Sequence, residues 1–377
     1  MKQQIIKNNT AGIYLHIPFC LSKCDYCDFV SFASGNKEEY ITALCLDIKQ
    51  KSEKYPNLCL DTIYLGGGTP SILSAVQVER ILACVKEHFE ISIGAEITIE
   101  VNPKTVDKEK LLAFKNLGIN RVSVGVQSFE NSELESVSRA HTGAEAKEVL
   151  SWVSEIFPNF SIDLMLGLPT STMKSVFHNV KTALSFSPNH ISLYGLQVEE
   201  GTVLAKKVEN GLQIPREDTL ADMFELVENI LKENGYSHYE ISNFAKTGFE
   251  SRHNIGYWKL KNYLGIGISA HSLVGFERFY SPSTMAEYLL AVSQNNCEIS
   301  EETLSKQEAQ KEYVMLGLRL GDGICFADFE NMFALDFQKE YREPIAKLQA
   351  YLQITNTHIA IPEKYFYVSN QIISEFM

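Results

Sequence analysis

Six short apolar runs, each followed by a longer segment with helical periodicity, occupy the chain from Ala11 to about Leu196. This alternation is typical of a parallel sheet covered by helices. Since eight such units close a full (β/α)8 barrel, six units predict a partial (β/α)6 barrel whose open side admits a large substrate. The expected strands are Gly12–Pro18, Thr62–Leu65, Glu96–Val101, Arg121–Val126, Phe160–Leu166 and His190–Tyr194, with helices of roughly 10–18 residues between them.

The alternation stops near Pro215, which indicates a different architecture beyond it. We expect a helix at about Asp218–Glu233, a short strand around Tyr239–Ile241 and a loop-rich stretch from Arg252 to Phe276. The remainder predicts helix from Thr284 to about Leu320, a segment Phe326–Phe333, a helix near Gln338–Gln353, and a hairpin formed by His358–Pro362 and Tyr365–Ser369.

The sequence is therefore α/β, with a partial barrel followed by a small, winged-helix-like α+β domain. The expected boundaries are 1–240 for the barrel, 241–290 for a connecting segment and 291–377 for the C-terminal domain.

Composition excludes several classes of protein. Hydrophobic residues make up 45% of the chain and charged residues 21%, and no stretch reaches about 18 consecutive apolar residues, so neither a membrane-spanning nor a disordered chain is expected. The net charge of −13 would repel a phosphate backbone, so nucleic acid is not an expected partner. The polar stretch Met1–Thr10 lacks a secretory signal, which predicts the cytoplasm.

Three of the eight cysteines fall between positions 20 and 27, directly after the first expected strand. Cys20, Cys24 and Cys27 place three thiolates on one short loop, as soft metals and iron–sulfur clusters require. Structural zinc would need a fourth nearby ligand, and the next position in register is Phe29. Three ligands on a four-iron cube leave one iron open to a substrate. Three incidental buried cysteines are the alternative, which the position after a strand disfavours.

Polar or glycine residues also follow the later strands. Gly66 to Gly68 precede Thr69 and Pro70, and the absence of side chains lets a ligand approach the backbone. Ligands collect at the carboxyl ends of parallel strands, so these residues are expected to surround one site. The others in this set are Glu100, Gln127, Arg139 and Asp163.

The segment His16–Cys27 is similar to the cluster-binding loop of the radical S-adenosylmethionine (SAM) superfamily, and its flanks resemble the coproporphyrinogen dehydrogenase (HemN)-like branch. The match runs from about Tyr14 to the C-terminal domain. The resemblance implies a [4Fe-4S] cluster on Cys20, Cys24 and Cys27, with the open iron chelated by the amino and carboxylate groups of SAM. An electron from the reduced cluster then breaks the sulfonium bond and gives a 5′-deoxyadenosyl radical.

The resemblance also implies which residues contact the cofactor. Arg139 is the partner for the SAM carboxylate, because its planar fork pairs with carboxylates bidentately. Glu100 accepts hydrogen bonds from an ammonium or a ribose, whereas Gln127 and Asp163 suit ribose hydroxyls. Taken singly, each could be an ordinary solvated or capping residue, and Tyr14 could be a core aromatic. The complete expected set is Tyr14, Tyr26, Gly67, Gly68, Thr69, Glu100, Gln127, Arg139 and Asp163.

Within the branch, three features resemble the HemW heme chaperones more than the dehydrogenases. Phe29 stands where the dehydrogenases carry a fourth cysteine, and the cluster loop begins within twenty residues of Met1, which leaves no room for their N-terminal extension. The segment His253–Trp258 matches the His-Asn-x-x-Tyr-Trp motif of HemW. His253 is either an axial heme ligand or a structural hydrogen bonder, and His271 is a weaker alternative ligand.

The expected function is therefore heme binding and transfer to acceptor proteins, with no coproporphyrinogen oxidase activity. Alternatives are a coproporphyrinogen III dehydrogenase, a radical SAM methyltransferase, and a cluster protein without a heme role. No catalytic residue is assigned, and cleavage of SAM stays open. The implied partners are heme, heme-accepting proteins and an electron donor such as flavodoxin or ferredoxin, and a homodimer is compatible with the sequence.

Overall fold

The computed structural model describes residues 9–377, so most of the N-terminal stretch in which no secretory signal is predicted lies outside the described residues. The six expected parallel strands are confirmed, and they are neighbours in chain order. They are β1 (Thr10–Ile17), β2 (Cys59–Gly67), β3 (Glu90–Val101), β4 (Arg121–Gln127), β5 (Phe160–Leu166) and β6 (His190–Gly195).

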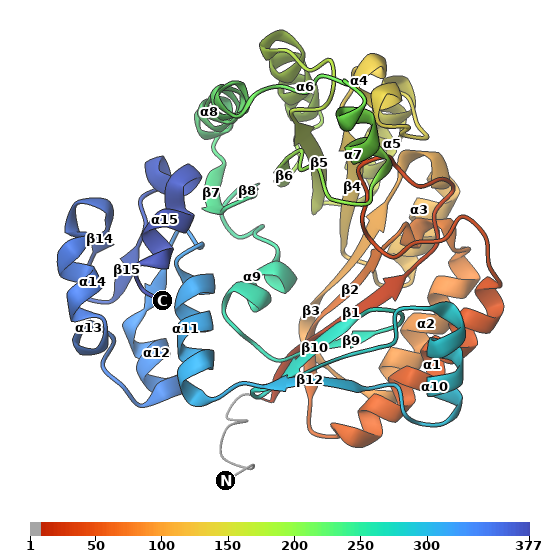
Figure 1. Ribbon diagram of the computed structural model, residues 1–377. Helices are drawn as coiled ribbons and strands as arrows, with labels where there is room; N and C mark the ends of the chain where they lie inside the picture. The colour runs from red at the N-terminus through yellow and green to blue at the C-terminus, as the bar shows by residue number, and fades with distance from the viewer. Residues whose placement is uncertain (1–8) are drawn as a thin grey trace.

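Helices cover the convex face of this curved sheet (Figure 1). The helices are α1 (Lys37–Lys54), α2 (Ala75–His88), α3 (Lys108–Asn116), α4 (Asn131–Ser136), α5 (Gly143–Ile156), α6 (Met173–Ser185) and α8 (Glu217–Glu233). All but α4 and α8 begin at side chains that accept a hydrogen bond from the first turn, such as Ser74 and Thr142, each of which forms a reciprocal capping box. The short helix α7 (Val203–Glu209) instead packs against the segment that follows β1, where the amide of Leu204 donates to the carbonyl of Asp25.

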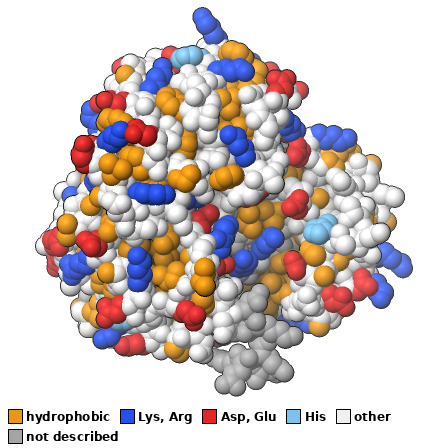
Figure 2. Space-filling view, turned by 180° about the vertical axis from the view of Figure 1, so that it is seen from behind, with side chains coloured by type: hydrophobic (Ala, Val, Ile, Leu, Met, Phe, Trp, Pro, Cys, Tyr) orange, Lys and Arg blue, Asp and Glu red, His pale blue; other side chains and the backbone are white. Residues whose placement is uncertain are grey.

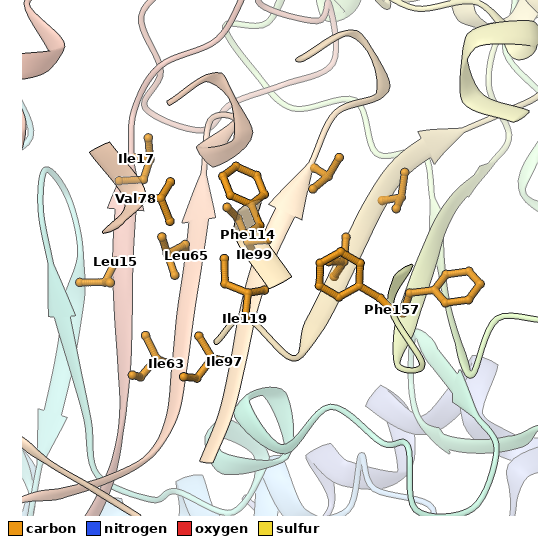
Figure 3. Packing of buried hydrophobic residues seen from close by; sticks show 14 of the residues in the cluster. Leu15, Ile17, Ile63, Leu65, Val78, Ile97, Ile99, Phe114, Ile119 and Phe157 are labelled. Carbon is orange, nitrogen blue, oxygen red and sulfur yellow. The ribbon is translucent and has the colours of Figure 1, made fainter. Parts of the chain in front are cut away.

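The core lies between the sheet and these helices. Leu15, Leu65 and Ile99 project from three adjacent strands and are fully buried. Phe114 of α3 and Val78 of α2 belong to the same apolar cluster (Figure 3). Burial of such side chains contributes about 1.5–3 kcal/mol each. Since alternate residues of a strand point to opposite faces, the other half of each strand faces the concave side, where the polar residues lie.

The large sheet is wider than predicted. Its twelve strands include β9 (Tyr263–Ile266), which pairs parallel to β1 and thereby places β1 between two neighbours. The stretch from residue 252 to 276, predicted as loop, instead contains α9 (Arg252–Trp258), β9 and β10 (His271–Val274), so that prediction was wrong. Strands of four residues are too short for the alternation of buried and exposed side chains to be recognised in the sequence. The remaining strands are β11 (Glu277–Tyr280) and β12 (Ile299–Thr303) at one edge, and β8 (Asn243–Ala245) and β7 (Ser237–Glu240) at the other.

The predicted helix from residue 284 to 320 is interrupted by β12, which leaves α10 (Met285–Ser293) and α11 (Lys306–Gly317). The helix expected near 338–353 is also broken, into α13 (Phe337–Glu340), α14 (Arg342–Lys347) and a 3-10 turn, η3 (Gln349–Tyr351). Pro344 has no N–H to continue the bonding of the preceding turn.

The C-terminal part has its own aromatic core and a small sheet. Phe329 of α12 (Phe326–Phe333) packs edge-on against Phe337, with ring centroids 5.0 Å apart. The predicted hairpin was wrong, because β15 (His358–Ala360) pairs with β13 (Ile324–Cys325) and β14 (Gln353–Ile354). The second expected strand is instead the 3-10 helix η4 (Glu363–Val368) followed by α15 (Ser369–Ser374). The domain boundaries at 240 and 290 stay predictions.

Two surface findings bear on partners. Figure 2 shows lysine and arginine mixed with acidic side chains across the face seen from behind, without a continuous basic field. In residues 9–377, no helix has the length and apolarity needed to cross a membrane.

Candidate functional site

A cavity of about 550 Å³ lies at the carboxyl ends of the parallel strands. It brings together every predicted site residue except Tyr14 and His253. The lining includes Cys20, Cys24, Cys27, Tyr26, Gly67, Gly68, Thr69, Glu100, Gln127, Arg139 and Asp163.

The cysteine loop between β1 and α1 is fixed at several points. The amide of Cys20 donates to the carbonyl of Phe32 at 3.0 Å. Asp25, which is buried, accepts from the Ser138 hydroxyl at 2.9 Å and pairs with Lys207 of α7. These contacts tie the loop to two other segments of the barrel, so the position of the thiols does not depend on the loop alone.

The three thiols are half-buried and form part of one wall of the cavity. Thr69 Oγ1 lies 3.6 Å from Cys20 Sγ, and Arg139 Nη1 lies 3.4 Å from Cys24 Sγ. Burial raises the pKa of the Cys27 thiol. Within residues 9–377 no three His, Cys, Asp or Glu side chains converge into a ready metal site. The donor set nevertheless fits an iron–sulfur cluster, because three soft ligands from one loop face the same space.

Gly68 lets the cysteine loop approach the glycine loop, which is the segment Gly66 to Gly68. A Cβ there would lie 2.8 Å from the carbonyl oxygen of Phe19 and 3.0 Å from Cys20 Sγ. Neighbouring Gly67 has a φ of 114°, a conformation that side-chain-bearing residues rarely adopt. The geometry thus shows a close approach of the two loops, and the predicted approach of this backbone to a ligand stays a prediction.

Glu100 closes the far side of the glycine loop. Its carboxylate accepts a hydrogen bond from Tyr64 Oη at 2.8 Å and from the amide of Gly67 at 3.2 Å. Burial, with a contribution from nearby Asp163, raises the pKa of Glu100 to about 7. A cation placed in the cavity would favour the ionised form and would thereby gain a partner.

Asp163 lies on β5 beside a buried arginine. Ser123 Oγ donates to its carboxylate at 3.0 Å, and Ser161 Oγ at 3.2 Å. Burial raises the pKa of Asp163, while the hydrogen bonds and the Arg121 guanidinium oppose the shift. Arg121 is 2% exposed and also lines the cavity. Arg121, Ser123 and Ser192 were not predicted as site residues. Arg121 and Ser123 are two positions apart on β4, and this spacing is the signal that they share one face of the sheet.

Arg139 lies beside one of the cluster thiols, with Nη1 3.4 Å from Cys24 Sγ. Its Nη2 donates to the carbonyl of Gly125 at 2.5 Å, and its buried Nε has no partner among the described residues. Tyr26 and Cys24 raise the pKa of Arg139 against the opposing effect of burial. Gln127, at a φ of 67°, ends β4 beside it. The Arg139 guanidinium lines the cavity and is a donor suited to a carboxylate.

Tyr14 does not line the cavity itself but contacts Tyr64, which does. Its hydroxyl donates to His16 Nδ1 at 3.0 Å, and His16 Nε2 donates to the carbonyl of Val30 at 3.0 Å. The ring stacks on Tyr64 with centroids 6.2 Å apart. Tyr14 therefore supports Tyr64 and, through His16, the end of the cysteine loop.

His253 lies at the start of α9, on the concave side of the sheet (Figure 1), and is 4% exposed. Its Nδ1 is 2.7 Å from Thr62 Oγ1, and its Nε2 is 2.9 Å from Tyr257 Oη. Burial lowers the pKa of His253 to about 3, so the ring is neutral. Both ring nitrogens have partners, and the neighbouring Asn254, rather than His253, lines the cavity.

Glu96 of β3 holds α9 in place. Its two carboxylate oxygens accept from the amides of Arg252 and His253, each at 3.1 Å. An anion at a helix N-terminus satisfies donors that have no partner within the helix. The alternative ligand His271 is exposed and lies 3.4 Å from Glu301, away from the cavity residues.

Comparisons with known proteins agree with this geometry. A family model described as the radical SAM superfamily matches residues 14–182, and one described as the HemN C-terminal domain matches residues 304–364. Coproporphyrinogen III oxidase (HemN) from Escherichia coli, a radical SAM enzyme, has the same fold with a TM-score of 0.86 at 22% identity, covering 99% of this chain and 92% of that one.

Relatives of known name extend over nearly the whole chain. The heme chaperone HemW of Lactococcus lactis is 37% identical over 378 residues, which is 98% of both chains. The heme chaperone HemW of Bacillus subtilis is 36% identical and covers 85% of this chain and 86% of its own. The chain therefore belongs to the HemW family of heme chaperones within the radical SAM superfamily.

Proposed function

We propose that this protein binds a [4Fe-4S] cluster through Cys20, Cys24 and Cys27, binds SAM beside it, and carries heme to acceptor proteins in the cytoplasm. The observation that carries the first two parts is the cavity, where three thiols, a glycine loop and oppositely charged side chains line one space. The heme part rests on the relatives, which are named as heme chaperones.

Different residues of the cavity would bind different groups of SAM. When bound, a reduced cluster supplies the electron that radical SAM chemistry requires. Arg139 would donate from its guanidinium to the carboxylate of SAM, and Glu100 would accept from the ammonium group. Asp163 and Gln127 accept from or donate to the ribose. The bound cofactor would be held between the cysteine loop and the carboxyl ends of β3 to β5.

Phe29 favours the carrier function over decarboxylation of coproporphyrinogen III. This residue is 63% exposed at the mouth of the cavity and supplies no fourth thiolate. The likeness of this chain to HemN is a likeness of fold alone. The heme acceptor, an electron donor such as flavodoxin or ferredoxin, and a homodimer belong to the same proposal.

An anaerobic preparation with reconstituted cluster tests the function directly. Titration with heme should give a saturable complex. When a heme-free acceptor protein is added, heme should leave this protein and bind to the acceptor. In parallel, coproporphyrinogen III should not be converted to protoporphyrinogen IX. Efficient conversion of coproporphyrinogen III would contradict the proposal that the protein is a heme carrier.

The pKa of Glu100 predicts a pH dependence of SAM binding. Only the ionised carboxylate attracts the ammonium group, so affinity should rise as pH increases through about 7. Between about pH 6 and pH 8 the expected gain is about tenfold, from the change in the ionised fraction. Calorimetric titration over this range measures it. Glu100→Gln should bind more weakly and lose this pH dependence; an unchanged profile in the variant would assign the dependence to another group.

The hydrogen bonds of His253 predict a structural effect of its removal. His253→Ala leaves Thr62 and Tyr257 without their partner, at a cost of about 1–3 kcal/mol for each buried group left unpaired. A lower thermal midpoint with an unchanged heme spectrum is therefore expected.

Tyr257→Phe separates this structural effect from heme ligation. It frees His253 Nε2 while retaining the ring, so an axial histidine would bind heme more tightly in Tyr257→Phe. Such tightening, together with a shifted spectrum in His253→Ala, would establish His253 as the ligand and contradict the structural role.

A further inference from the structure

Two further cysteines lie next to each other outside the cavity, on the convex side of the sheet. Cys45 of α1 and Cys84 of α2 are both half-buried, and Cys84 Sγ donates to the carbonyl of Cys45 at 3.3 Å. The cavity contains neither of them. The binding of cluster, SAM or heme proposed above makes no use of this pair.

The register between the two helices places these thiols together. One turn before Cys84, Arg80 Nη2 donates to Thr42 Oγ1 at 2.9 Å, and Arg80 Nη1 lies 3.4 Å from Glu38 Oε2. Residues 38, 42 and 45 of α1 thus meet residues 80 and 84 of α2 along one seam. Residues three and four apart share one helix face, so the thiols continue a seam that the polar pairs have already aligned.

The two thiols differ in character. The neighbouring Cys84 side chain lowers the pKa of Cys45 against the effect of burial, and Arg80 adds to the lowering. The Cys45 side chain and burial raise the pKa of Cys84. A partly exposed thiol of lowered pKa beside a second cysteine is the arrangement found in redox-sensitive pairs.

We propose that Cys45 and Cys84 form a thiol–disulfide site that reacts with small disulfides of the glutathione class. The Cys45 thiolate attacks one sulfur of glutathione disulfide, the sulfur–sulfur bond breaks, and one glutathione leaves with a proton. Cys84 loses its proton and attacks the mixed disulfide at the sulfur of Cys45, which releases the second glutathione. Two protein thiols are oxidised, and one glutathione disulfide is reduced to two glutathiones.

The position of the pair gives the bond a structural consequence. Helix α1 follows the cysteine loop, and α2 follows the glycine loop, so a Cys45–Cys84 bond ties together the two units that bring Gly68 against Cys20. Oxidation would restrain the separation of these two loops without occupying either of them.

Peptide mapping of the intact protein, with its cluster reconstituted, tests the proposal. Trypsin releases residues 38–49 with Cys45 as the single cysteine, and residues 81–86 with Cys84 as the single cysteine. After treatment with glutathione disulfide and alkylation of free thiols, these two peptides should appear linked, with two fewer alkylated cysteines per chain. Dithiothreitol should restore both. The cluster cysteines lie in other peptides, residues 8–23 and 24–37, so their oxidation cannot be mistaken for the link.

Three variants complete the test. Cys84→Ser should leave Cys45 carrying one glutathione, since the resolving thiol is gone, and Cys45→Ser should prevent linkage. Cys59→Ser is the matched control, because Cys59 is also half-buried and lies 3.1 Å from Ser92 Oγ, and it should leave the link unchanged. Separate alkylation of Cys45 and Cys84 after exposure to glutathione disulfide would overturn the proposal. So would linkage of either to another cysteine.

Discussion

Replacing Cys24 by alanine is expected to abolish the visible absorption of the reconstituted cluster and to reduce bound iron from about four per chain to background. The three cysteines come from one loop, and Phe29 cannot replace a lost thiolate. Cys24 also faces Arg139 at 3.4 Å, so its removal would leave that cation without its sulfur partner. Absorption spectroscopy and iron analysis after anaerobic reconstitution measure the effect.

Cys325→Ala is the matched control for this prediction. Cys325 is also half-buried, but it lies at the start of α12 in the C-terminal part, away from the cavity. Its replacement should leave iron content unchanged. Full cluster content in Cys24→Ala would remove the ligand assignment.

Replacing Arg139 by alanine is expected to weaken SAM binding by about 10- to 100-fold, because a charge-assisted pair of this kind contributes roughly 1.5–3 kcal/mol. The Arg139 guanidinium, which lines the cavity, is the donor that a carboxylate would engage. Equilibrium dialysis against labelled SAM gives the affinity. Iron content should be measured in the same samples, since Arg139 also contacts Cys24.

Arg139→Lys distinguishes charge from geometry. Lysine retains the positive charge but lacks the planar fork, so its SAM affinity should lie between those of the native protein and Arg139→Ala. Unchanged affinity in Arg139→Ala, with full iron content, would exclude this residue from the SAM site.

The barrel could be predicted from sequence because its strands are long enough to be recognised and each is followed by a helix with its own periodicity. The six parallel strands were expected at their observed places, whereas β9 to β11 were not. A run such as Tyr263–Ile266 is too short to distinguish from a loop, and its partner β1 lies about 250 residues earlier in the chain. The C-terminal hairpin was wrongly predicted because the aromatic residues between 365 and 369 suited a strand. They form a 3-10 helix instead, with Phe366 buried and Tyr365 partly buried against the core.

The candidate site could be predicted wherever a residue directly follows a strand. Cys20 and Gly68 follow β1 and β2 and were found in this way, whereas Glu100 and Asp163 lie within β3 and β5. Arg121 was not, because it begins a strand and an arginine at a strand end ordinarily faces solvent. The position of His253 depends on Glu96, which anchors α9 within the concave side from about 150 residues away, and no local pattern reports such a contact.

The pairing of β1 with β9 has a consequence for how the chain is made. On a ribosome, β1 emerges early and acquires β2 soon afterwards, but Tyr263 follows Ile17 by 246 residues. At about 5–20 residues per second this interval lasts roughly 12 to 50 s. Throughout it, a strand whose Ile13 and Leu15 are destined for full burial keeps one hydrogen-bonding edge open. That edge is where the nascent chain is most exposed to pairing with another polypeptide, and the late arrival of β9 is what removes the hazard.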